Sequence, residues 1–312
     1  MDNAIDFIIN SIRLNDNKVK YVVQHSYNPN INNTIHFYVY SNKNKLSYIV
    51  STYRKSSKQL MKRQNEIMQN ILNRINSNEI KNAIVFSFQV INWNDYVFRI
   101  QEYINHSKNT KKLHKEINQY IKSSFDWLYK FQKETVGKIW PAENIKTEIV
   151  TSLKSLQKKY SNQKNLNKIV NDLLKNIAVI HSPLPVSASH GDFFIGNYFF
   201  DTNNHVKIID WEYANSKELV SFDFTSNIMG YAIYFDFNIV RSFYSPKTHI
   251  ENLIQQEIKK FLNIYKLNFN ELMYYLIYTK IILLTREGRK LTNDKINQLN
   301  LFYEKNFHKS IS

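Results

Sequence analysis

HGDFFIGN at residues 190–197 and IIDWE at residues 208–212 are the two stretches that say most about this chain. Asn197 follows Asp192 by five positions, and Asp210 follows Asn197 by thirteen. Phosphoryl transfer of the kinase type uses one carboxylate to orient and deprotonate a hydroxyl, while an amide and a second carboxylate hold Mg²⁺ on the nucleotide phosphates. The spacing therefore predicts that Asp192 is catalytic and that Asn197 and Asp210 are metal ligands.

The residues between the two stretches predict a hairpin. Residues 198–200 are aromatic and suit a strand, residues 201–204 form a turn cluster, and residues 206–209 suit a second strand. Because a hairpin folds back on itself, we expect Asp210 to return beside Asn197. Two oxygen ligands would then converge as Mg²⁺ requires, with phosphate oxygens and water in the remaining positions.

Each of these residues has a simpler explanation when it is taken alone. An Asp after Gly is commonly a turn residue, and an Asn before aromatic residues commonly caps an element. Both spacings together, with a hairpin between them, favour the metal-binding interpretation. His190 is the exception, since a buried imidazole that is satisfied by the loop backbone is more common than an additional catalytic group. We expect His190 to be structural.

The runs HGD at 190–192 with Asn197, and IDWEYA at 209–214, resemble the aminoglycoside phosphotransferase and choline kinase superfamily of protein-kinase-like small-molecule kinases. The resemblance implies that Asp192 is the catalytic base, that Asn197 and Asp210 bind Mg²⁺, and that Asp223 braces the catalytic loop through hydrogen bonds. Asp223 also suits the N-cap of a helix that begins near Thr225, and both roles are compatible. The specific part of the resemblance covers about residues 186–226.

The order of predicted elements implies the α+β, two-lobed fold of that superfamily. Residues 1–101 are expected to form a small N-terminal lobe with an antiparallel sheet and one helix, and residues 102–312 a larger, mostly helical lobe. In the first lobe we expect strands at 34–40, 46–51, 84–91 and 96–100, and a helix at 58–75. In the second lobe helices are expected at 112–134, twice within 145–180, and at 219–235, 250–265, 270–284 and 293–307.

The segment after the last front strand is a candidate adenine site. Gln101, Glu102 and Tyr103 occupy the connector where a kinase-like fold offers backbone groups to a purine edge. The alternative is an ordinary linker between two lobes, and no side chain here decides between them.

The front lobe departs from the superfamily at the phosphate-binding positions. No glycine precedes Gly137, so a Gly-rich phosphate loop is absent, and the segment 25–30 with Ser26 is the candidate replacement. Residues 49–53 lack the third-strand lysine of the family, which makes Arg54 and the neighbouring Lys55 the nearest cations. Glu66 matches the helix glutamate that pairs with this lysine, and it equally suits a solvent-facing carboxylate beside Lys62 or Arg63.

Acceptor binding is expected from residues that flank Asp192. The candidates combine aromatic faces with charges, and among them Glu212 directly follows the metal-binding turn. For the aromatic candidates, packing in the core is the more common outcome at helical spacing. The full set is Trp211, Glu212, Tyr231, Tyr234 and Arg286.

Composition fits a globular enzyme. The chain has 312 residues, 43% of them hydrophobic, and it lacks cysteine, which excludes disulfides and thiol catalysis. No apolar run predicts a membrane span, and the first residues do not resemble a signal peptide, so a cytoplasmic location is expected. The net charge of +16 is spread over the chain, and we expect no nucleic-acid partner.

These patterns together predict a phosphotransferase that moves the γ-phosphate of ATP to a hydroxyl of a small molecule, with Mg²⁺ as cofactor. A sugar or aminocyclitol is the first expectation for the acceptor, and choline or another amino-alcohol the second; GTP stays open as the donor. The missing lysine and glycines leave a nucleotide-binding pseudokinase or scaffold as the alternative. A protein kinase is disfavoured, because residues 210–223 leave little room for a long activation loop and no Ala-Pro-Glu element follows Asp210.

Overall fold

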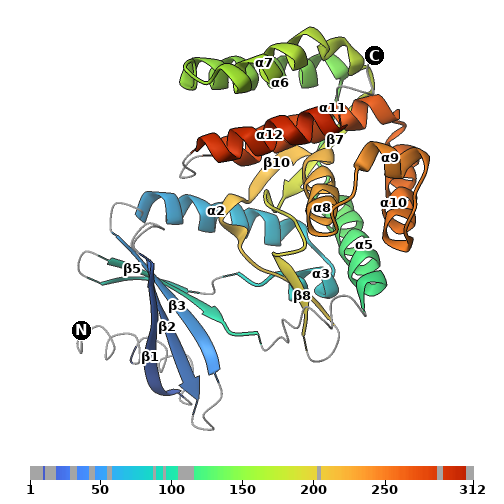
Figure 1. Cartoon of the computed structure of the whole chain (residues 1–312). Helices are drawn as coiled ribbons and strands as arrows, with labels where there is room; N and C mark the ends of the chain where they lie inside the picture. The colour runs from blue at the N-terminus through green and yellow to red at the C-terminus, as the bar shows by residue number, and fades with distance from the viewer. Residues whose placement is uncertain are drawn as a thin grey trace.

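The computed structural model describes residue 10 and residues 19–28, 34–41, 46–54, 58–86, 89–93, 96–104, 116–201, 205–286 and 291–306. A front sheet lies at the lower left of Figure 1, most helices lie at the upper right, and helix α2 lies between them. The α+β class and the division into a sheet lobe and a helical lobe are as predicted. Among the described helices, none combines the length and the apolar character needed to cross a membrane.

The front sheet has five antiparallel strands in the order β1-β2-β3-β5-β4. One face carries the buried side chains Phe37, Val50 and Ile100, which lie opposite one another across neighbouring strands. In β2 burial alternates, with Phe37 and Val39 buried and Tyr38 half-buried, as a strand with one face on the core requires. The strands are β1 (Val19–Asn28), β2 (Thr34–Ser41), β3 (Leu46–Arg54), β4 (Gln89–Trp93) and β5 (Tyr96–Glu102).

The predicted strand at 84–91 is wrong in its first half. After β3 the chain forms α2 (Lys58–Arg74) and the short helix α3 (Asn78–Ala83), which Ser77 caps. Ile84 then bridges to Ile208, and the Val85 N–H donates to the Ile208 carbonyl at 2.8 Å. These residues therefore pair with the helical lobe, and β4 begins only at Gln89.

The second lobe is built from helices whose positions the sequence predicted, with one addition. The helical pair within 145–180 is present and is broken between residues 160 and 163. Helix α9 was not predicted, because six residues give too short a pattern. The helices are α5 (Ile117–Thr135), α6 (Ala142–Lys159), α7 (Lys164–Lys175), α8 (Ser221–Tyr234), α9 (Ile239–Tyr244), α10 (His249–Tyr265), α11 (Phe269–Thr285) and α12 (Asn293–Asn306).

Short strands inside the helical lobe carry the HGD and IDWE stretches. Strand β7 (Leu184–Ser189) lies between β6 (Ile139–Trp140) and β10 (Asn215–Leu219) and ends directly before His190. The hairpin of β8 (Tyr198–Phe200) and β9 (Val206–Ile208) follows, with Tyr198 opposite Ile208. This is the predicted hairpin, one residue shorter at its end.

Candidate functional site

The HGD loop is fixed to helix α8 by the carboxylate of Asp223. One oxygen accepts the N–H of His190 at 2.6 Å and the other accepts the N–H of Gly191 at 2.9 Å. Burial raises the pKa of Asp223 to about 7, and the two N–H groups act in the opposite direction. Helix α8 begins at Ser221, so Asp223 lies inside the first turn and the N-cap interpretation is wrong. The bracing contacts implied by the resemblance are present.

His190 lies beneath the loop with no exposed surface. Its Nδ1 accepts the N–H of Asp192 at 3.2 Å, which assigns the proton to Nε2, and Nε2 then donates to the Ile209 carbonyl at 2.7 Å. Burial lowers the pKa of this imidazole to about 4, so it is neutral at pH 7. His190 thus joins the loop that carries Asp192 to the strand end that carries Asp210.

Asn197 and Asp210 are brought together by the predicted return of the hairpin. The Ile209 N–H donates to the Asn197 carbonyl at 2.9 Å, and the Asn197 amide nitrogen donates to the Asp192 carbonyl at 2.8 Å. Asn197 and Asp192 are each 7% exposed, whereas the side chain of Asp210 is exposed. One chain of hydrogen bonds therefore links Asp192, Asn197 and Ile209, the residue directly before Asp210.

The oxygen set of these residues fits Mg²⁺. The amide nitrogen of Asn197 is used inside the loop, so its Oδ1 is the atom of that side chain suited to a cation, and Asp210 adds a carboxylate. Over the residues that the structure describes, no group of three or more His, Cys, Asp or Glu converges. Two protein oxygens suit Mg²⁺, because this ion usually takes its remaining ligands from substrate phosphates and water.

Gly191 makes a close approach that a side chain would block. Its φ is 84°, and a Cβ built on it would lie 2.1 Å from the carbonyl oxygen of Tyr213. Glycine is needed here both for the positive φ and for the contact. The HGD loop therefore packs directly against the backbone that follows Asp210.

Two of the predicted acceptor residues lie in the core. Trp211 has no exposed surface, donates its indole N–H to the Ile208 carbonyl at 3.0 Å and packs edge-on against His190. Tyr231 also has no exposed surface, and its hydroxyl accepts that of Tyr198 at 2.6 Å. Neither side chain is placed to contact an acceptor. Trp211 lies in the 3₁₀ turn after β9 and Tyr231 inside helix α8, and core packing is what the structure shows for both.

The charged acceptor candidates are placed nearer the surface of the site. Glu212 is exposed. The remaining aromatic candidate, Tyr234, ends helix α8 and is 41% exposed. The guanidinium carbon of Arg286 lies 4.8 Å from the Tyr213 ring centre and 5.0 Å from that of Phe222. Arg286 thus lies beside the turn that follows Asp210, and its charge lowers the pKa of Asp223 against the larger effect of burial.

On the nucleotide side, the connector offers fewer backbone groups than the sequence predicted. The Tyr103 N–H donates to the Ser47 carbonyl at 2.8 Å, and Gln101 lies opposite Ile49 in the same register. Because successive residues direct their backbone groups to opposite edges, Gln101 and Tyr103 face β3 and Glu102 faces away from it. Of the three hinge candidates, Glu102 has backbone groups directed toward the open edge.

Among the other nucleotide candidates, Glu66 is the one whose side chain the structure describes, and it is exposed. Glu66 is 66% exposed and pairs with Lys62 at 3.9 Å, which is the solvent-facing alternative. Ser26 lies in β1 and Arg54 ends β3, but their side chains, like all of Lys55, lie outside the described residues.

Two polar residues near this side were missed by the sequence analysis. Gln64 of α2 donates to the Glu212 carbonyl at 2.6 Å, two residues beyond Asp210. Arg99 of β5 lies directly opposite Ser51 of β3, so the two share one face of the sheet, and its guanidinium carbon lies 5.0 Å from the Phe86 ring centre. For Gln64 the available signal was its place as a polar residue within the apolar stripe of α2. For Arg99 there was none, because the sequence does not specify the strand register.

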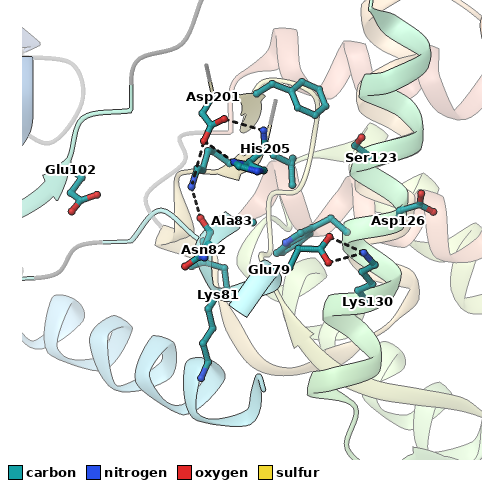
Figure 2. A pocket seen from close by; sticks show the side chains of 15 residues that line it. Glu79, Lys81, Asn82, Ala83, Glu102, Ser123, Asp126, Lys130, Asp201 and His205 are labelled. Atoms are coloured by element: carbon teal, nitrogen blue, oxygen red, sulfur yellow. Dashed lines mark hydrogen bonds and ion pairs between the residues drawn. The ribbon is translucent and has the colours of Figure 1, made fainter. Parts of the chain in front are cut away.

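A pocket of about 830 Å³ lies between α3, α5 and the β8–β9 hairpin. Figure 2 shows Glu102 across this pocket from Asn82 and Asp201. Ion pairs and hydrogen bonds join the residues that line it, among them Lys130 with Glu79 at 2.7 Å. Asp192, Asn197 and Asp210 do not line it.

Comparison with known proteins identifies the fold. No family model matches the sequence, and no curated protein matches it. Among solved structures, ADP-bound aminoglycoside phosphotransferase APH(2'')-Ib matches with 16% identity and a TM-score of 0.53, over 96% of this chain and 99% of that one. The streptomycin-ATP-APH(2")-IIa ternary complex matches with 15% identity and a TM-score of 0.53, over 96% and 98%.

A third match is a choline/ethanolamine kinase family protein from Mesorhizobium loti, with 9% identity and a TM-score of 0.54, over 97% of this chain and 94% of that one. Matches over nearly the whole of both chains show that this chain has the two-lobed, protein-kinase-like fold of these phosphotransferases. The resemblance seen in the sequence is confirmed at the level of the fold.

Proposed function

We propose that this chain is a small-molecule kinase that transfers the γ-phosphate of ATP to a hydroxyl group. The observation that carries the proposal is the hydrogen-bonded chain through Asp192, Asn197 and Ile209, which joins the backbone of the proposed base to the proposed metal ligand Asn197 and to the residue before Asp210. The shared fold supports it, since the matched structures include phosphotransferases with ADP or ATP bound.

In the proposed reaction, the carboxylate of Asp192 accepts the proton of the acceptor hydroxyl as its oxygen attacks the γ-phosphorus in line. The new bond joins that oxygen to phosphorus, the bond from the γ-phosphorus to the β–γ bridging oxygen breaks, and ADP leaves. A Mg²⁺ ion held by Asn197 and Asp210 would neutralise charge on the β- and γ-phosphates. Neutral His190 keeps the Asp192 backbone in place without adding charge beneath it.

The proposed acceptor is a sugar or aminocyclitol, with an amino-alcohol such as choline as the second class. The matched structures support both classes, because one is a streptomycin complex and another belongs to the choline/ethanolamine kinase family. In this chain exposed Glu212 and nearby Arg286 are the charged groups proposed to contact the acceptor. Such an enzyme would use cytoplasmic ATP.

The test is ADP release from ATP and Mg²⁺ in the presence of a panel of aminoglycosides, sugars and amino-alcohols. Asp192→Asn and Asp210→Asn should each lower turnover by about 10²-fold or more and leave the melting temperature close to that of the wild type. Asp236→Asn is the matched control, because the Asp236 side chain is 97% exposed and lies outside the proposed site. Full activity of the Asp210→Asn protein would contradict the proposal.

The second candidate function is a nucleotide-binding pseudokinase. It is favoured by one observation, the absence of a lysine from residues 49–53 of β3. Thermal stabilisation by ATP with Mg²⁺, without ADP release on any acceptor of the panel, would select this candidate.

A further inference from the structure

Helix α2 carries half-buried polar side chains within its buried stripe, and Gln64 is one of them. Met61, Met68 and Ile71 are at most 6% exposed, and Gln64 lies between them at helical spacing. Its side chain is half-buried, and the hydrogen bond that it makes lies at an exposed position. The Nε2 of Gln64 donates to the carbonyl oxygen of Glu212 at 2.6 Å, 148 residues away in the chain.

The accepting carbonyl follows a residue with an unusual backbone conformation. Asp210 has φ 65° and ψ 54°, the left-handed region, and a 3₁₀ turn over Trp211–Tyr213 follows it. A residue with a Cβ occupies this region at a cost in free energy and stays there only where its surroundings hold it. On one side of Asp210 the Ile209 carbonyl accepts from His190, and on the other the Glu212 carbonyl accepts from Gln64.

A second contact extends the same arrangement along α2. Arg74 donates through Nη1 to the Ser216 carbonyl at 2.7 Å. Gln64 and Arg74 are ten residues apart, which is about 15 Å along a helix. Helix α2 therefore lies along the segment 212–216 and binds it at two carbonyls.

This segment also contacts the catalytic loop. The Tyr213 carbonyl lies where a Cβ of residue 191 would be, so any shift of residues 212–213 moves the surface on which Gly191 packs. Gly191 directly precedes Asp192. The backbone held by Gln64 is thus shared by both halves of the candidate site.

We propose that Gln64 is a positioning residue for Asp210, with Arg74 as a supporting one. The hydrogen bond to the Glu212 carbonyl keeps Asp210 in its left-handed conformation and so keeps its carboxylate directed for metal binding. The inference rests on the proposed function, in which Asp210 binds Mg²⁺. Loss of one hydrogen bond of this kind weakens the binding of Mg²⁺ by up to about tenfold.

The first experiment is hydrogen exchange without any ligand. In Gln64→Ala, the N–H groups of Ile209 and Ala214, which donate to the Asn197 and Trp211 carbonyls, should exchange several-fold faster than in the wild type. Gln69→Ala is the matched control, since Gln69 is an exposed glutamine of the same helix, and its exchange in this segment should equal that of the wild type. Unchanged exchange in Gln64→Ala would overturn the proposal.

The second experiment is a Mg²⁺ titration of turnover. Gln64→Ala should need up to about tenfold more Mg²⁺ for half-maximal rate and should regain nearly full turnover at saturation. Gln64→Glu keeps the size of the side chain but removes the donor, so it should show the same defect if the alanine protein folds poorly. Gln64→Lys restores a donor and should recover part of the affinity. A lower turnover that Mg²⁺ does not restore would overturn the positioning role.

The two experiments separate this inference from the proposed function. If no acceptor is phosphorylated, the proposed function fails, while hydrogen exchange still tests the contact between Gln64 and the Asp210 turn. If Asp210→Asn abolishes turnover but Gln64→Ala matches Gln69→Ala in both experiments, the kinase proposal stands and the role of Gln64 is wrong. The role of Arg74 is tested in the same way. Arg74→Ala is the variant, Arg63→Ala at an exposed position is the control, and hydrogen exchange is compared at residues 214–219.

Discussion

The HGD loop with its surroundings and the front lobe hold their polar side chains in different ways. His190, Asp192, Asn197 and Asp223 are at most 7% exposed, and each is joined to the loop by hydrogen bonds. In the front lobe Glu66 is 66% exposed and meets one lysine at 3.9 Å. Buried hydrogen bonds fix a geometry because breaking them leaves unsatisfied groups, whereas an exposed ion pair between two long side chains contributes little.

This difference indicates which of the two regions sets the proposed reaction geometry. The backbone of the HGD loop and the Asn197 amide, which support the groups proposed to act on the hydroxyl and the metal, are held by buried hydrogen bonds before any ligand binds, and preorganised polar groups are the ones that stabilise a transition state. Substitutions in the HGD loop should therefore change stability and activity more than substitutions at exposed positions of the front lobe.

The largest effect is expected at Gly191. In Gly191→Ala the new Cβ would lie 2.1 Å from the Tyr213 carbonyl oxygen and 2.8 Å from its carbon, and both are backbone atoms at a residue with φ 84°. We expect a loss of about 3 kcal/mol or more in the free energy of unfolding, together with the loss of activity. Denaturant unfolding measures the first quantity.

Gly137→Ala is the matched control for this substitution. Its Cβ would meet nothing closer than 3.5 Å, and Gly137 does not have a positive φ. The free energy of unfolding should change by less than about 1 kcal/mol. Equal destabilisation by the two alanines would show that the contact between Gly191 and Tyr213 does not hold the loop.

An intermediate effect is expected in the pH dependence of stability, where His190 and Asp223 act in opposite directions. Burial lowers the pKa of His190 from 6.5 to about 4, so its contribution to stability is complete above pH 6.5 and is lost as the pH falls to 4. The size is about 3 kcal/mol. Burial raises the pKa of Asp223 from 3.8 to about 7, so its contribution is complete below pH 3.8 and is lost as the pH rises to 7.

Single substitutions should reveal these opposing slopes. Relative to the wild type, His190→Asn should gain stability as the pH falls from 7 to 4, and Asp223→Asn should lose it. Denaturant unfolding of the three proteins at several pH values gives the free energy of unfolding of each. Subtracting the wild-type value from that of each variant removes the contribution of all other titrating groups. Differences with the same sign would contradict the assigned burial of one residue or the other.

The sequence predicted the candidate site well where its contacts are local. Asp192, Asn197 and Asp210 lie within nineteen positions, and one hairpin fixes their approach, so spacing alone was informative. Trp211 and Tyr231 were harder, because an aromatic residue near a site looks the same whether it packs inward or lines a pocket. The structure places both in the core.

The front lobe could be predicted as strands and a helix, but not in its contacts. The bridge from Ile84 to Ile208 and the hydrogen bond from Gln64 to Glu212 join residues more than 120 positions apart. Such contacts depend on how two lobes dock, and a local pattern does not encode docking. Glu66 was assigned to the nucleotide site on element order alone, while the rotation of α2 that directs Gln64 inward directs Glu66 to solvent.

The smallest effect is expected for Glu66→Ala. Its ion pair with Lys62 is an exposed helix pair at 3.9 Å, worth about 0.5 kcal/mol or less, so the melting temperature should barely change. Nucleotide affinity should also be unchanged, because the side chain faces away from the candidate site. Gln64→Ala on the same helix provides the contrast, since its effect on Mg²⁺ dependence should exceed that of Glu66→Ala by up to about tenfold. A loss of ATP affinity in Glu66→Ala would mean that α2 rotates when nucleotide binds, and the front lobe would then share in setting the reaction geometry.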